Sequence, residues 1–236
     1  MRNTKDLKQT FSSIQNTLLP GVILDNIFQI EEIRLIAGVD VAYWDENKAT
    51  YGVCSIVIID YHTKEVIEQV YSVGEITIPY IAGFLAFREL PLVMDAVNKL
   101  MIQPDLYLFD GNGYLHERHM GIATHASFYL NRPTIGVAKS YLKIGNVDFV
   151  VPENITGAYT DIIIEGKVYG RALRSRLRVK PIFISCGNLI DMDTATEIVM
   201  SLIGKNSRIP IPLRLAHLTT NQMRKKLIEQ WVHLFS

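Results

Sequence analysis

The chain has 236 residues, 48% of them hydrophobic, so it is long enough to bury the core of one large domain. Its 24 basic and 24 acidic residues balance, which excludes polyanion binding through overall charge and restricts any nucleic-acid site to a local patch. The two cysteines, Cys54 and Cys186, lie in separate apolar runs, a pattern that favours reduced core thiols over a disulfide framework. The sequence shows no signal-peptide-like start and no membrane-spanning run, so we expect a soluble cytoplasmic protein.

Hydrophobic spacing predicts an amphipathic helix over 4–18, which we expect to serve packing only. Three strand-like runs follow, and a short polar turn between the last two favours an antiparallel meander. Helical patterns then alternate with short apolar runs, which is typical of parallel strands joined by right-handed crossovers. The predicted strands are 35–43, 51–60, 65–73, 106–109, 134–137, 162–164, 168–173 and 182–185, and the later helices are 84–101, 120–130, 191–203 and one that follows Pro210 and Pro212.

Three antiparallel strands followed by helix, strand, helix and strand form the layout of the ribonuclease H-like fold. The sequence therefore predicts an α/β protein with a mixed central sheet flanked by helices. It contains no internal repeat, low-complexity tract or linker, so we expect a single domain over residues 1–236. Layout alone does not assign a function, so the site residues must do so.

Three carboxylates stand out from this layout. Asp40 lies within an otherwise apolar strand, where an unpaired charge is costly. Asp110 ends the apolar run 106–109, and Glu89 lies in the first turns of the helix that follows Gly83, so all three can converge at one sheet edge. Clustered carboxylates suit Mg²⁺ or Mn²⁺, and either one or two ions fit the pattern. Taken singly, each acid has another interpretation, as the partner of a buried arginine, a solvated helix residue or a cap.

A linked series of motifs resembles the endonuclease V family, in the same order and over most of the chain. The first motifs surround the three carboxylates, and later ones continue to residue 217. They are Ala37-Gly38-Val39-Asp40-Val41-Ala42-Tyr43, the run 79–89 that ends in Arg88-Glu89, Asp110-Gly111-Asn112-Gly113, His116, Gly121-Ile122-Ala123-Thr124-His125, the run 133–140, the run 170–176 and Arg214-Leu215-Ala216-His217.

The resemblance implies magnesium-dependent nicking at the second phosphodiester bond on the 3′ side of deoxyinosine, leaving the base in place and 5′-phosphate and 3′-hydroxyl ends. Asp40, Glu89 and Asp110 match the metal-binding carboxylates of the family. His217 matches a fourth active-site position, and Lys139 matches a lysine near the scissile phosphate. From the residues alone, a lone helix histidine such as His217 is more often a packing or surface residue, and Lys139 can be an ordinary solvated lysine at a strand end.

Base recognition is implied by a second set of matching residues. The tetrapeptide Pro79-Tyr80-Ile81-Ala82 matches a wedge that fills the gap left by a rotated base. Ala82 replaces a proline found in many relatives and so removes a constraint on loop shape, and Glu117 also stands where relatives often carry proline. The implied recognition pocket comprises Gly83, Leu85, Gly111, Gly121 and Ile122, although the glycines serve turns and caps equally well.

Contacts to the nucleic-acid backbone are expected from two places. An alternation of basic residues over 174–180 predicts a strand with all four charges on one face, suited either to a phosphate backbone or to a solvated sheet face. His116, on a glycine-rich loop, is expected to contact phosphate or position water, unless it is simply solvated. The basic residues are Arg174, Arg176, Arg178 and Lys180.

The leading hypothesis is therefore a DNA-repair endonuclease that acts on deoxyinosine or other deaminated bases. An endoribonuclease for inosine in RNA is the nearest alternative. A non-catalytic nucleic-acid-binding protein of the same fold is a third, and the intact set Asp40, Glu89, Asp110 and Lys139 argues against it. The sequence implies no membrane partner and no particular oligomer.

Overall fold

A mixed eight-stranded sheet forms the centre of the fold. The computed structural model describes residues 4–235, with side chains through residue 230. The strand order is β3-β2-β1-β4-β5-β8-β7-β6, in which β1, β4 and β5 run parallel and all other neighbouring pairs are antiparallel. The strands are β1 (Leu35–Glu46), β2 (Ala49–Asp60), β3 (Val66–Glu75), β4 (Leu106–Phe109), β5 (Thr134–Ala138), β6 (Tyr159–Ile164), β7 (Lys167–Leu173) and β8 (Ile182–Asn188).

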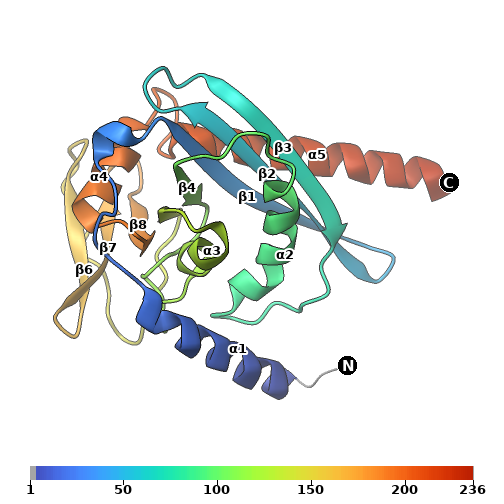
Figure 1. The fold of residues 1–236 in the computed structure, drawn as a ribbon, viewed down its shortest axis with the longest axis horizontal. Helices are drawn as coiled ribbons and strands as arrows, with labels where there is room; N and C mark the ends of the chain where they lie inside the picture. The colour runs from blue at the N-terminus through green and yellow to red at the C-terminus, as the bar shows by residue number, and fades with distance from the viewer. Residues whose placement is uncertain (1–3, 236) are drawn as a thin grey trace.

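Helices lie on both sides of this sheet. In Figure 1, α2 and α3 lie in front of it, α5 runs along the other side, and α1 lies below α2 and α3. Within residues 4–235, none of the helices combines the length and apolar character that crossing a bilayer requires. The helices are α1 (Thr4–Leu18), α2 (Leu85–Val97), α3 (Ile122–Leu130), α4 (Met192–Ser201) and α5 (Ile211–Phe235), with short 3₁₀ turns η1 (Leu19–Gly21) and η2 (Ile30–Glu32).

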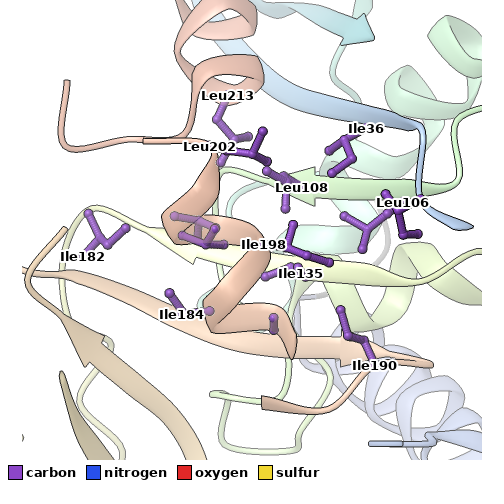
Figure 2. Packing of buried hydrophobic residues seen from close by; sticks show 14 of the residues in the cluster. Ile36, Leu106, Leu108, Ile135, Ile182, Ile184, Ile190, Ile198, Leu202 and Leu213 are labelled. Carbon is purple, nitrogen blue, oxygen red and sulfur yellow. The ribbon is translucent and has the colours of Figure 1, made fainter. Parts of the chain in front are cut away.

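The two faces of the sheet bury separate cores, because neighbouring residues of a strand point to opposite sides. Ile36 and Ala37 are both fully buried, yet they belong to different clusters. Ile36 packs with Leu108 and with Ile198 of α4 (Figure 2), whereas Ala37 shares its cluster with residues of α2 and α3. The sheet is therefore covered by α4 and α5 on one face and by α2 and α3 on the other.

Gly38 lets α5 contact the backbone of β1. A Cβ atom at this position would lie 2.2 Å from the carbonyl carbon of Pro212, near the start of α5, so any side chain would push the helix away. The close contact brings the following turns of α5 to the next part of β1. Asp40 lies there, two residues beyond Gly38.

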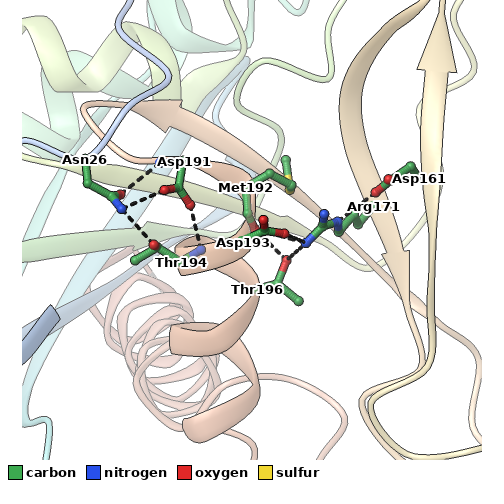
Figure 3. A network of polar contacts seen from close by, with 8 residues as sticks. All are labelled: Asn26, Asp161, Arg171, Asp191, Met192, Asp193, Thr194 and Thr196. Atoms are coloured by element: carbon green, nitrogen blue, oxygen red, sulfur yellow. Dashed lines mark hydrogen bonds and ion pairs between the residues drawn. The ribbon is translucent and has the colours of Figure 1, made fainter.

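A buried arginine attaches the far end of the sheet to α4. Arg171 of β7 is 8% exposed, and its guanidinium contacts Asp161 of β6 at 2.7 Å and Asp193 of α4 at 2.7 Å (Figure 3). The hydroxyl group of Thr196 accepts a further hydrogen bond from it at 3.1 Å. Buried charges require such partners, and here the partners fix β6, β7 and α4 relative to one another.

The mixed α/β layout predicted from the sequence is confirmed. The predicted elements over 4–18 and 106–109 match α1 and β4, and the others differ at their ends by a few residues. One predicted strand, over 174–180, is wrong. β7 ends at Leu173, β8 begins at Ile182, and Arg178 has a φ of 60°, a left-handed conformation foreign to strands. The side chains that lack the predicted common sheet face are Arg174, Arg176, Arg178 and Lys180.

Candidate active site

Asp40 lies on the central part of β1 and is 5% exposed. Two residues of α5 contact its carboxylate. The hydroxyl group of Thr220 donates a hydrogen bond to Oδ2, and Nδ1 of His217 lies 3.4 Å from the same oxygen. Thr220 and His217 are three residues apart on the helix, so both face β1. Asp40, the charged residue in an otherwise apolar strand, is therefore held by α5, the helix that packs against Gly38.

Asp110 lies beside Asp40 because β4 is parallel to β1. The strands pair up to Val39 and Phe109, and the amide of Asp110 then donates to the carbonyl oxygen of Val39 at 3.2 Å. Lys139 directly follows β5, the next strand of the sheet, and its ammonium group pairs with Oδ2 of Asp110. Parallel strands thus deliver the carboxylate and the lysine to the same edge of the sheet.

A metal ion fits the group formed by Asp40, Asp110 and His217. One ligand atom from each lies within 4.8 Å of the others. Burial, together with the neighbouring Asp110, raises the pKa of Asp40 to about 6, whereas the hydrogen bond from Thr220 opposes the shift. A divalent cation would offset both effects, and two carboxylates are a common set of protein ligands for Mg²⁺.

Glu89 lies near this group without belonging to it. It is on α2, 7% exposed, and its Oε1 accepts a hydrogen bond from the hydroxyl group of Tyr43 on β1. Burial raises the pKa of Glu89 to about 8, and the charges of Asp40 and Asp110 contribute to the shift. The predicted convergence of three carboxylates therefore takes a different form, in which Asp40 and Asp110 meet His217 while Tyr43 engages Glu89.

Two residues of the predicted wedge and most of the predicted recognition residues line one pocket of about 210 Å³. Tyr80 stands at its rim with 71% of its surface exposed. Pro79, Ile81 and Gly111 are not among the residues that line it, and Ile81 is instead buried at 6% exposure. The predicted residues that line the pocket are Tyr80, Ala82, Gly83, Leu85, His116, Gly121 and Ile122.

The wedge continues into a tight turn. The amide of Phe84 donates to the carbonyl oxygen of Ile81 at 3.0 Å, and Gly83, the third residue of the turn, has a φ of +80°. This geometry is that of a type II turn, which needs glycine at the third position and favours proline at the second. Ala82 occupies the second position, where proline would restrict the loop.

His116 is buried at 6% exposure and contacts the backbone through both ring nitrogens. The amides of Arg118 and Met120 donate to Nδ1 at 3.1 and 3.4 Å, so Nε2 carries the hydrogen and donates to the carbonyl oxygen of Gly83 at 3.1 Å. Burial, with a contribution from Arg118, lowers the pKa of His116 to about 4. Both ring nitrogens of His116 are therefore already engaged, and neither is free for the expected contact with phosphate.

Arg174 likewise has an internal role. It is 9% exposed, and its guanidinium donates to the carbonyl oxygens of Pro152 at 2.9 Å, Glu153 at 3.3 Å and Val179. These contacts fix the loops on either side of β6 and β7. Arg176 lines a separate shallow hollow that also includes Lys205.

Sequence reasoning missed Thr220, Tyr43 and the partner of His217. The side chain of Asn221 lies 3.1 Å from Nε2 of His217 and completes the α5 side of the group. Thr220 carried a usable signal, because its spacing of three from His217 places both on one helical face. Tyr43 carried no comparable signal, since its contact with Glu89 joins β1 to α2 across 46 residues.

Comparison with known proteins assigns the chain to a family. The family model for endonuclease V matches residues 17–218. The endonuclease V of Bacillus thuringiensis subsp. konkukian is 69% identical over 225 residues, which cover 95% of this chain and 96% of that protein.

Solved structures agree with this assignment. The crystal structure of Bacillus subtilis endonuclease V superposes with a TM-score of 0.91 at 55% identity, covering 98% of this chain and 95% of that one. The endonuclease V of Ciona intestinalis, solved with a 24mer DNA containing an inosine followed by a ribo-adenosine, gives a TM-score of 0.83 at 26% identity, covering 94% and 99% of the two chains. The chain therefore belongs to the endonuclease V family and is a nuclease.

Proposed function

We propose that the protein is a magnesium-dependent DNA-repair endonuclease that nicks the second phosphodiester bond 3′ to deoxyinosine and leaves the base in place. The observation that carries the proposal is that the pocket lies next to the group formed by Asp40, Asp110 and His217, called the acidic group below. Asn112, which lines the pocket, is two residues beyond Asp110, and Leu85, which also lines it, lies one helical turn before Glu89, the buried carboxylate near that group. A nucleic-acid strand that places a base in the pocket would therefore pass next to the carboxylates.

Each residue of the acidic group has a definite part in phosphodiester hydrolysis. Asp40 and Asp110 would hold the cation, with His217 as the third ligand of the group. A bound Mg²⁺ would supply the charge that polarises the phosphate and lowers the pKa of an attacking water. The ammonium group of Lys139 pairs with Asp110 and can stabilise negative charge that develops on the phosphate.

The wedge and the pocket would select the strand to be cut. Tyr80 exposes its ring at the pocket rim, where it can fill the gap left by a base rotated out of the stack. Unstacking costs least at a weak pair, and an inosine pair is such a site. The Ciona relative solved with inosine-containing DNA supports this choice of substrate.

The test is a nicking assay on end-labelled duplexes that differ at one position, deoxyinosine or deoxyadenosine. With Mg²⁺ we expect one product, cut at the second bond 3′ to the inosine, and none with EDTA. Equal cleavage of both duplexes, or of neither, contradicts the proposal.

A parallel RNA duplex with one inosine tests the second candidate, an inosine-specific endoribonuclease. The ribo-adenosine that follows inosine in the Ciona complex favours including it. Cleavage of RNA alone would replace the first proposal with the second. The non-catalytic alternative is excluded if wild type nicks either substrate and Asp40→Asn does not.

A further inference from the structure

Helix α1 packs against the base of the wedge. Leu7 and Phe11 are buried in a cluster with Ile81 and Phe84, which are the first and last residues of the wedge turn. The ring of Phe11 also stacks on that of Phe87 in α2, with ring centroids 4.0 Å apart and planes inclined by 9°. The apolar side of α1 therefore supports the loop that carries Tyr80.

One polar residue of α1 is buried within this contact. Gln15 is 1% exposed, and its amide makes three hydrogen bonds. Nε2 donates to the carbonyl oxygens of Met120 at 3.2 Å and Gly83 at 3.3 Å, and Oε1 accepts from Nε of Arg118 at 2.6 Å. A buried amide is costly unless its donors and acceptor are used, and here both ends are used.

The partners of Gln15 lie on the two walls of the pocket. Gly83 belongs to the wedge side, whereas Met120 belongs to the loop that precedes α3, and both line the pocket. Arg118 strengthens this connection, because its Nη2 donates to the carbonyl oxygen of Gly83 at 2.7 Å and its guanidinium lies over the ring of Phe84 at 4.2 Å. Gln15 therefore connects the two walls to each other and to α1.

We propose that Gln15 is a positioning residue that fixes the separation of the pocket walls, so that α1 is a functional part of the base reader. Gln15 lies just before residues 17–218, the segment that matches the family model. The inference deepens the proposed function and rests on it for its substrate. Its physical basis is that a pocket can reject a wrong base only while its hydrogen-bonding groups are held in place.

The decisive variant is Gln15→Met, which retains a side chain of similar length and removes all three hydrogen bonds. We expect the ratio of kcat/KM on deoxyinosine to kcat/KM on deoxyadenosine to fall about tenfold, mainly through KM, with the dependence on Mg²⁺ concentration unchanged. Gln15→Glu should not restore the ratio, because a carboxylate keeps the contact with Arg118 but cannot donate to the carbonyl oxygens of Gly83 and Met120.

Two control variants separate positioning from loss of stability. Thr17→Val removes a hydroxyl group that bonds within α1, to the carbonyl oxygen of Ser13, and should leave the ratio at the wild-type value. Ile198→Val reduces packing on the opposite face of the sheet and should lower the melting temperature without changing the ratio. If Ile198→Val lowers the ratio as much as Gln15→Met, or if Gln15→Met leaves it unchanged, the inference is overturned.

Hydrogen exchange of the metal-free protein tests the bridge without any substrate. Gln15→Met should accelerate exchange about tenfold in both segments 81–87 and 113–121, with no change in β1 or β4, whereas Thr17→Val should accelerate neither. If wild type fails to nick inosine substrates while this pattern appears, the proposed function is wrong and the bridge stands. If exchange in the two segments is unaffected, the bridge is wrong whatever the substrate proves to be.

Discussion

The acidic group and the base pocket lie side by side but are held by different means. The backbone of the sheet positions Asp40 and Asp110, since the amide of Asp110 bonds to the strand that carries Asp40. The pocket is formed by two loops that side chains connect, namely Gln15, His116 and Arg118. We therefore expect the sheet to fix the proposed metal site and the side-chain bridges to set the proposed choice of base, so single substitutions should affect the two functions separately.

The largest effect is expected from Asp40→Asn. Because it removes one charge from the group that would hold the cation, nicking should fall more than about a hundredfold, while affinity for an inosine duplex remains within a few-fold of wild type. Quantitative nicking and fluorescence anisotropy check the two halves of this prediction. Equal loss of binding and cleavage would show that the pocket and the acidic group are not separable.

The same variant should stabilise the metal-free fold. The pKa of Asp40 rises from 3.8 to about 6 on folding, so the folded state binds the proton more tightly and loses stability as pH rises from about 4 to 6. Removing the carboxylate should therefore increase the free energy of unfolding at pH 7 by about 1–3 kcal/mol. Urea unfolding with and without Mg²⁺ checks it, and only wild type should gain stability from the metal.

A smaller effect on the acidic group is expected from Thr220→Val, which removes the hydrogen bond to Asp40 and keeps the shape of the side chain. The apparent affinity for Mg²⁺ should fall about tenfold, the usual cost of removing a partner that orients a ligand. Thr219→Val is the matched control, because the neighbouring hydroxyl group accepts from Gln69 instead. Similar losses in both variants would refute a specific role for Thr220.

Acid should weaken the pocket region through His116. Its pKa falls from 6.5 to about 4 on folding, so the unfolded chain binds more protons between these values and stability declines as pH drops through that window. Between pH 7.5 and 5, His116 should cost wild type about 2 kcal/mol that His116→Gln does not lose. Urea unfolding at both pH values measures the difference, and the neighbouring His125 contributes equally to both proteins. Parallel pH dependence in the two proteins would contradict this account of His116.

The smallest effect is expected from Ala82→Pro at the second position of the wedge turn. Proline suits that position of a type II turn and restricts the unfolded chain, so the fold should gain about 0.4–1 kcal/mol. The selectivity for deoxyinosine should rise modestly, with no change in the dependence on Mg²⁺. Nicking of matched duplexes and thermal unfolding test the two parts, and a fall in stability would show that the turn differs from type II.

Asp40, Asp110 and Lys139 could be predicted from the sequence because their signals are local, whereas His217 was indicated only by the family resemblance. An isolated charge within an apolar strand marked Asp40, and strand ends marked Asp110 and Lys139. The layout of the sheet then brings these residues together, as the structure places them. Most strands and helices could be predicted for the same reason, because the hydrophobic periods of two and 3.6 residues are properties of short segments.

Neither the Gln15 bridge between the pocket walls nor the loop conformation of residues 174–180 could be predicted, because long-range contacts determine both. Gln15 looked like one more polar residue of a packing helix, and its partners are 68 and 105 residues away. The alternating charges after Leu173 imitate a strand, yet Arg174 folds that segment into a loop by binding carbonyl oxygens 21 and 22 residues earlier. The periodicity of a short segment does not indicate which distant residues will bind its side chains.

The contact between Thr220 and Asp40 also bears on when the candidate metal site is completed during synthesis. The two residues are 180 positions apart, and α5 reaches β1 only by lying against Gly38. Contacts of such long sequence separation close late, after the entropy of the intervening loop has been lost. A nascent chain that has formed all eight strands but not yet released α5 still lacks His217 and Thr220. Because α5 follows all the strands in the chain, the group formed by Asp40, Asp110 and His217 can be completed only after those strands have been synthesised.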